Sequence, residues 1–392
     1  MTQTGPHPPL NRSAMCLPAA QLVDALDERI AGKREVLAER DRQWGAERCR
    51  ISSYLEPIAW PPLFGFDMNR FYTDPEFMLE QELRQRVFWL DNTLGDDLAG
   101  FELCPSTGFY WDFTLFGQQI RTDRDGVPHF LPHPLAEAPN TGLLSCFDFA
   151  TSGDMPVLLR QYRELRRLSQ ERCCGRVGVA FPRFHRGPVD MLIQMRGYER
   201  FVYDTLERPE FVRQALDVFV AERLRWNRAR AEWLGEAFGR QSTFIADDWV
   251  NPPFLSPAMF RDFVLPAYRA IQDNEGPVTG FHTCGPLVEL VTDLLRDMPG
   301  IRTLDVSGWN DLEALDEVVD PQIAFHCQMR NTFVLCGTAD EHRQQLATVR
   351  RIGARRRVDV GVQSIVRLLP TYDETLFRMN RFIELARQVL GG

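Results

Sequence analysis

The sequence contains 392 residues, 44% of them hydrophobic and 25% charged, with a formal net charge of −9. This composition is typical of a globular protein, and no run approaches the roughly 18 apolar residues that suggest a membrane span. The acidic balance argues against nucleic-acid binding, because contacts to phosphates need a concentrated basic face. We therefore expect a soluble protein that binds neither nucleic acid nor membranes.

The N-terminus and the cysteine content indicate the compartment. The first 13 residues, MTQTGPHPPLNRS, contain no basic region followed by an apolar core, so they do not resemble a secretory signal. Nine cysteines, an odd number, are scattered over a long chain, which argues against a disulfide framework and for reduced thiols. A cytoplasmic location is expected.

In chain order, a disordered tail is expected over residues 1–13, and an amphipathic helix follows from Leu22 with one apolar face among many charges. We assign this tail and helix to an N-terminal extension, residues 1–50, and the rest of the chain, 51–392, to one domain. From about residue 50, short apolar runs alternate with helical stretches. The runs expected to be strands are 57–67, 100–105, 176–182, 242–248, 277–285, 301–308, 322–328 and 357–364.

Eight strands alternating with helices predict an α/β fold, a (β/α)8 TIM barrel with an N-terminal helical extension. Residues 109–149, rich in Gly, Pro and aromatic residues, interrupt this alternation and are expected to form a long excursion. A doubly wound open sheet is the alternative, but no Gly-rich dinucleotide-binding motif follows any of the expected strands.

The active site of a TIM barrel lies at the carboxyl ends of its strands. Polar side chains gather where the expected strands stop, and polar groups are costly to bury unless they are paired or bind a ligand. These residues are Cys104, Arg183, His185, Asp247, Asp248, His282, Cys284, Asp305, His326, Cys327 and Gln363.

The most specific of these signals is the run FHTCG at residues 281–285, in which His282 and Cys284 stand two apart at one strand end. An imidazole and a thiolate suit Zn2+, which prefers tetrahedral N and S ligands and keeps a position open when it is catalytic. Such a zinc ion would hold a substrate thiol as a thiolate at neutral pH. A third ligand must come from another strand.

Several stretches around this pair resemble the uroporphyrinogen decarboxylase superfamily, which includes zinc-dependent methyltransferases that act on methylated corrinoid proteins. The matching stretches are GPVDMLIQMRGYERFVYDTLERPEFVRQALD, IADDWVNPPFLSPAMFRDFVLPAY, GFHTCGPLVELVTDLL and VVDPQIAFHCQMRNTFVLCGT, with weaker similarity at FYTDPEFMLEQEL, so that the resemblance covers most of residues 50–390. It implies a (β/α)8 barrel, a zinc pair at His282 and Cys284, and methyl transfer to or from a thiol or a related acceptor.

The sequence also departs from this family. In the corrinoid methyltransferases a third zinc ligand is a Cys on the last strand, whereas the corresponding run here is VGVQSIV, with Val362 near that position. Cys327 is the preferred substitute, because a second thiolate keeps the site soft. Alternatives are His326, Asp305 and, more remotely, Cys336, and the site could also have lost its metal or bind a different one. The Arg-rich RQAGRY signature of the porphyrinogen decarboxylases is missing, so decarboxylation of a porphyrinogen is not expected.

Roles follow for the remaining residues. Asp247 and Asp248 are the candidate catalytic residues, because paired carboxylates push their pKa values apart and one can transfer a proton. The candidates for substrate binding are Arg183, His185, Asp305 and Gln363. Arg183 suits a bidentate contact to a carboxylate, and Asp305 could alternatively orient His282.

The leading hypothesis is a zinc-dependent methyltransferase that moves a methyl group between a corrinoid, such as methylcobalamin, and a thiol or similar small acceptor. The sequence lacks the Asp-x-His-x-x-Gly corrinoid-binding motif, so the corrinoid would come free or on a separate corrinoid protein. The alternatives are a metal-independent lyase acting on a small carboxylate, and a metal- or corrinoid-binding accessory protein on an inactive barrel.

Overall fold

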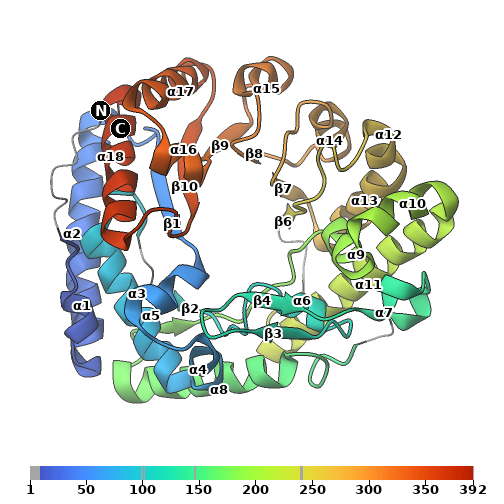
Figure 1. Cartoon of the computed structure of the whole chain (residues 1–392), viewed down its shortest axis with the longest axis horizontal. Coiled ribbons are helices and arrows are strands. Elements are labelled where there is room, and N and C mark those ends of the chain that lie inside the picture. Colours follow the sequence, from blue (N-terminus) through green and yellow to red (C-terminus); the bar gives the residue numbers. More distant parts are fainter. Residues whose placement is uncertain (1–8, 99, 101, 145–146, 239–241, 392) are drawn as a thin grey trace.

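The computed structural model of the chain describes residues 9–98, 100, 102–144, 147–238 and 242–391. Its centre is formed by parallel strands that curve around a common axis (Figure 1). The strands are β1 (Ile51–Leu55), β2 (Glu102–Leu103), β5 (Gly178–Val179), β6 (Thr243–Ala246), β7 (Val278–Thr283), β8 (Thr303–Val306), β9 (Ala324–Met329) and β10 (Val358–Ile365).

The pairing of these strands follows a barrel. Six of them form one parallel sheet in the order β1-β10-β9-β8-β7-β6, and β2 pairs in parallel with β5. A parallel bridge between Arg186, which follows β5, and Ala246 of β6 connects the two sheets. The prediction of a (β/α)8 barrel is therefore confirmed.

Each barrel strand except β2 is followed directly by helices that lie outside the strands (Figure 1). In chain order these are α3 (Trp60–Phe64), α4 (Met68–Thr73), α5 (Pro75–Asn92), α9 (Pro188–Arg196), α10 (Tyr198–Glu207), α11 (Pro209–Leu234), α12 (Pro257–Met259), α13 (Leu265–Glu275), α14 (Val291–Asp297), α15 (Leu312–Val318), α16 (Asn331–Cys336), α17 (Ala339–Gly353) and α18 (Tyr372–Leu390). No helix in the described part of the chain is long and apolar enough to cross a membrane.

Between β2 and β5 the chain makes the long excursion that its composition predicts. An antiparallel hairpin forms the middle of this segment, with its strands paired from Ile120 to Phe130. The elements of the excursion are α6 (Trp111–Thr114), β3 (Ile120–Thr122), β4 (Pro128–Phe130), α7 (Pro134–Glu137) and α8 (Met155–Cys173).

The first expected strand, 57–67, is wrong. That run forms a 3-10 turn and α3 instead, and β1 lies just before it. Its prolines stand in the first turns of these helices, where the missing N–H costs no hydrogen bond. The true strand, ISSYL, buries Ile51, Ser53 and Leu55 in alternation, but its serines hide the apolar pattern from a reading of the sequence.

The N-terminal extension consists of α1 (Ser13–Cys16) and the long helix α2 (Ala19–Trp44), which packs against α5. The expected helix from Leu22 is thus confirmed. Of the expected disordered tail, residues 1–8 lie outside the described residues, and Ser13 already begins a helix.

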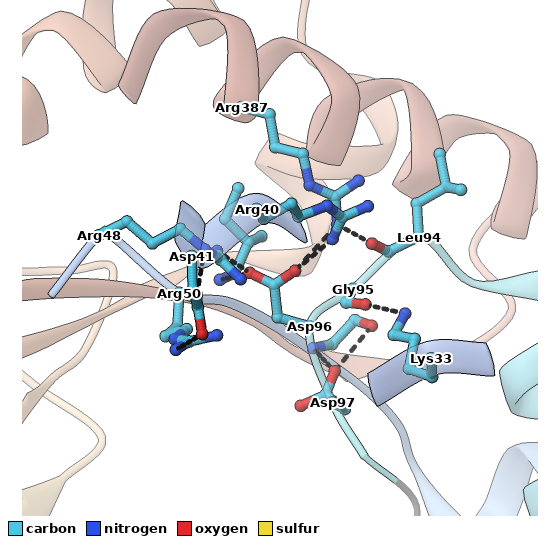
Figure 2. Close-up of polar contacts among 12 residues, drawn as sticks. Lys33, Arg40, Asp41, Arg48, Arg50, Leu94, Gly95, Asp96, Asp97 and Arg387 are labelled. Carbon is cyan, nitrogen blue, oxygen red and sulfur yellow. Dashed lines mark hydrogen bonds and ion pairs between the residues drawn. The ribbon is translucent and has the colours of Figure 1, made fainter. Parts of the chain in front are cut away.

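A buried carboxylate fastens this extension to the barrel (Figure 2). Oδ1 of Asp96 accepts hydrogen bonds from Arg40 of α2 at 2.5 Å and from Arg387 of α18 at 3.2 Å. Its Oδ2 accepts from Arg48 at 2.8 Å and from the backbone N–H of Ile51 at 3.0 Å. One side chain therefore joins the first long helix, the last helix and the first barrel strand.

Candidate metal centre

Three side chains at the carboxyl ends of β6 and β7 form a group that could hold a metal ion. Ligand atoms of Asp248, His282 and Cys284 all lie within 4.8 Å of one another, and this is the one such group of three among the described residues. Nε2 of His282 stands between the other two, 3.3 Å from Oδ1 of Asp248 and 3.5 Å from Sγ of Cys284.

The strand register brings these residues together. Ala246 of β6 pairs with His282 of β7, so that Asp248, two residues further along, follows β6 beside the end of β7. The turn after β6 is held to β7 because the backbone carbonyl of Asp248 accepts hydrogen bonds from Asn251 at 2.7 Å and from Thr283 at 3.1 Å.

Gly285 is needed for this arrangement. A Cβ atom at this position would lie 1.9 Å from Oδ1 of Asn251, the residue that holds the backbone of Asp248. The glycine of the run FHTCG therefore lets the segment after Cys284 approach the turn after β6.

A second carboxylate lies behind the imidazole. Nδ1 of His282 is 3.0 Å from Oδ2 of Asp305 on β8, and the side-chain amide of Gln328 donates to the same oxygen at 2.7 Å. Histidine ligands of metal sites usually direct their second nitrogen at such a carboxylate, which fixes the orientation of the ring. Nε2 is thereby left to face Asp248 and Cys284.

The charges of the group are strongly coupled. Burial lowers the pKa of His282, but the carboxylates of Asp248 and Asp305 outweigh burial and raise this pKa to about 12. Burial raises the pKa of Asp248, but the contact with His282 more than offsets it and the pKa is lowered. Cys284 reaches solvent on one side, but the protein around its thiol excludes enough water to be the largest effect, and this raises the pKa of the thiol. Without a metal, His282 is thus a cation beside an aspartate and a neutral thiol.

This donor set fits zinc. One imidazole nitrogen, one thiol and one carboxylate are ligand types that Zn2+ accepts, and three protein ligands leave a position for a substrate. The group is also open to solvent on one side: Cys284 is exposed, and the side chain of Asp248 is 32% exposed.

Asp247 is separated from this group although it neighbours Asp248. It is fully buried and accepts hydrogen bonds from the backbone of Val189 and Asp190, at the start of α9, and from the hydroxyl of Tyr268. Burial, followed by the charge of Asp190, raises its pKa well above the usual range. The structure gives Asp247 the position of a helix-capping residue rather than of a group that faces a substrate.

The preferred third ligand, Cys327, is not brought to the pair of His282 and Cys284. Side chains alternate along a strand, and in β9 the neighbours His326 and Gln328 face Asp305, so Cys327 points to the opposite side. It is almost completely buried there, and burial raises the pKa of its thiol. Asp248, and not Cys327, has a ligand atom within 4.8 Å of those of His282 and Cys284.

The other candidate residues are placed as follows. Arg183 and His185 are exposed, and no hydrogen bond or ion pair joins either of them to the metal group. Gln363 lies in β10, but its side chain is outside the described part of the structure. Cys104 is exposed, and Cys336 is exposed at the end of α16.

Arg186 is a buried residue near the metal group that the sequence analysis did not predict to belong to the site. This residue is 7% exposed, and its guanidinium donates to Asp112 at 2.8 Å and to the backbone carbonyl of Phe109 at 3.0 Å. It also contacts the faces of three aromatic rings in the segment after β2, and its charge helps to lower the pKa of Asp248. The Gly187-Pro188 pair was a usable signal, because it marks the start of α9 and so the true end of the segment that pairs with β6.

Fold and site together define a class: a (β/α)8 barrel with a candidate metal group at the carboxyl ends of adjacent strands. The family model for uroporphyrinogen decarboxylase (URO-D) matches residues 111–358, more than half of the chain. The protein therefore belongs to the uroporphyrinogen decarboxylase family, as the resemblance of its motifs implied.

Among solved structures, the chain is similar to a methyltransferase from Methanosarcina mazei, with 17% sequence identity and a TM-score of 0.56. The similarity covers 87% of this chain and 94% of that one, which shows a shared fold over nearly the whole length of both. No curated protein matches the chain.

Proposed function

We propose that the protein is a zinc-dependent methyltransferase that moves a methyl group between a corrinoid and a thiol or similar small acceptor. The observation that carries this proposal is the group of Asp248, His282 and Cys284, whose ligand atoms lie within 4.8 Å of one another at the catalytic end of the barrel. Membership of the family and the fold shared with a methyltransferase support it.

In this account Nε2 of His282, Sγ of Cys284 and a carboxylate oxygen of Asp248 would hold the zinc. The carboxylate of Asp305, 3.0 Å from Nδ1 of His282, would keep the ring oriented. Bound zinc would lower the pKa of an acceptor thiol and so supply a thiolate nucleophile at neutral pH. The solvent-exposed side of Cys284 leaves room for the acceptor to approach.

The test is methyl transfer from methylcobalamin to a small thiol such as 2-mercaptoethanol, followed as thioether formation by mass spectrometry. Zinc-loaded wild-type protein should form the thioether, and Cys284→Ser should not. Cys327→Ser is the matched control, because Cys327 is a buried thiol that faces away from the group, and it should keep the activity. Equal turnover by wild type and Cys284→Ser would contradict the proposal.

A further inference from the structure

A row of polar side chains crosses the barrel interior behind the metal group. Asp305 of β8 pairs in register with His282 of β7 and with His326 of β9, so that the three stand at one level of the barrel. Oδ1 of Asp305 lies 3.4 Å from Nδ1 of His326, and its Oδ2 lies 3.0 Å from Nδ1 of His282. One carboxylate thus stands between two imidazoles.

The row continues to the first strand. Nε2 of His326 lies 3.3 Å from the hydroxyl of Ser52 on β1, which in turn donates to the backbone carbonyl of Val360 on β10. Both ring nitrogens of His326 therefore face polar partners, and one end of the row is fixed to the backbone of the barrel.

We propose that His326 and Ser52 are positioning residues, which act through Asp305 to hold His282 with Nε2 directed at the metal. This inference rests on the proposed metal-dependent function, but it concerns residues that touch neither the metal nor the substrate. It assigns a role to a histidine at a strand end that would otherwise be taken for a ligand.

Asp305 alone would not hold His282 in one orientation, because an isolated carboxylate is free to rotate. Asp305 can rotate about its side-chain bonds, and each of its oxygens can meet His282 in more than one geometry. Gln328 restrains Oδ2 at 2.7 Å, and His326 stands at the other oxygen, Oδ1. His326 lies 3.4 Å from Oδ1 without a hydrogen bond to it, so it restricts rotation of the carboxylate by contact, and the imidazole of His282 that the carboxylate faces is restricted in turn. The carboxylate partner of a metal-ligating histidine is typically worth 10–100-fold in metal affinity. That contribution is lost when Asp305 turns away from His282.

The test uses Co2+, whose visible absorption reports the geometry of its ligands. Co2+ affinity and spectrum are measured for the wild type, for His326→Phe, which removes both polar contacts, and for His326→Gln, which can restore one. We expect His326→Phe to weaken Co2+ binding by about 10–100-fold and to change the spectrum, with His326→Gln recovering part of the loss.

The matched control is His342→Gln. His342 is buried, whereas His326 is partly exposed, and Nε2 of His342 lies 2.8 Å from the backbone carbonyl of Phe333, away from the barrel interior. This variant should bind Co2+ as the wild type does. Equal loss in His326→Phe and His342→Gln would show a general effect of disturbed packing and overturn the proposal.

The remaining outcomes separate this inference from the proposed function. Wild-type affinity and an unchanged spectrum in His326→Phe would overturn the inference alone, whereas a wild type that binds no Co2+ would overturn both. If His326→Phe does not fold, as judged by circular dichroism, the Ser52→Ala variant tests the positioning role instead. The loss of one neutral hydrogen bond should weaken Co2+ binding by about fivefold, and unchanged binding would contradict the positioning role.

Discussion

Oδ1 of Asp248 lies 3.3 Å from Nε2 of His282, although 34 positions of sequence separate the two residues. The contact joins the ends of two neighbouring parallel strands, and it brings a carboxylate to a pair that has no second thiolate within the same distance among the described residues. Compared with two thiolates, one thiolate and one carboxylate form a chemically harder, less polarisable ligand set. Zinc still accepts such a set.

Metal binding at this group should depend on pH. His282 has a pKa of about 12 in the metal-free protein, and the pKa of Cys284 is also raised. Both residues must lose a proton to bind a metal, so protons compete with the metal and the affinity should rise as the pH rises. Zn2+ titration calorimetry at several pH values and in buffers of different ionisation enthalpy measures this effect. Affinity that does not change with pH, with no release of protons, would contradict the assignment.

Asp96→Asn should destabilise the protein. The side chain of Asp96 is only 3% exposed and is paired with Arg40, Arg48 and Arg387. Its neutralisation leaves three guanidinium groups facing one another, and loss of one partner of a buried ion pair costs about 3 kcal/mol or more. Urea denaturation gives the change in the free energy of unfolding.

The control for this change is Asp340→Asn on the surface. Asp340 is 93% exposed, lies in the first turn of α17 and pairs with Arg343 one helical turn away, so its loss should change stability by less than about 1 kcal/mol. Similar effects of the two substitutions would show that Asp96 does not fasten the extension to the barrel.

Gly187→Ala should be poorly tolerated. A Cβ atom at this position would lie 2.1 Å from Cγ of Asp247, which is fully buried and caps α9. The carboxylate would have to move away from the start of α9, at a cost of about 3 kcal/mol. Gly353→Ala, where a Cβ atom meets nothing within 4 Å, should be nearly neutral in the same thermal melts. A Gly187→Ala protein as stable as the wild type would refute this view of Asp247.

Lys33 should titrate far below an ordinary lysine. Burial, followed by the charge of Arg40, lowers its pKa from 10.5 to about 8. Between these two values the unfolded chain binds the proton and the folded chain does not, so this group makes the free energy of unfolding increase with pH in that window. Because Lys33 is the only lysine, reductive methylation with 13C gives a single side-chain NMR signal besides the terminal amine. A midpoint near 10.5 would contradict the prediction.

The barrel could be predicted because its later strands are apolar, short and separated by amphipathic helices. β1 could not, because Ser52 and Ser53 break its apolar pattern: Ser52 faces His326 and Ser53 faces Asp97, and in the sequence two adjacent serines look like a loop. The long helix α2 was predictable from the spacing of Leu22, Leu26 and Ile30, all of which are buried.

The site was predictable only in part. His282 and Cys284 are neighbours in one short run, so the chain itself brings them together. Asp248 differs from Asp247 only in the direction in which its side chain leaves the turn after β6, and that direction depends on tertiary contacts. The sequence also limits the role of Cys327 as a zinc ligand. His326 and Cys327 are adjacent in a strand, so only one of them can face the barrel interior.

The most direct test of the central claim is the zinc content of the protein purified without a metal-binding tag, measured by mass spectrometry for the wild type, Asp248→Asn, Cys284→Ser and Cys327→Ser. The account predicts about one zinc per chain in the wild type and in Cys327→Ser, and a marked loss in Asp248→Asn and Cys284→Ser. Loss of zinc in Cys327→Ser with full retention in Asp248→Asn, or a wild type that takes up no zinc when it is supplied, would contradict it.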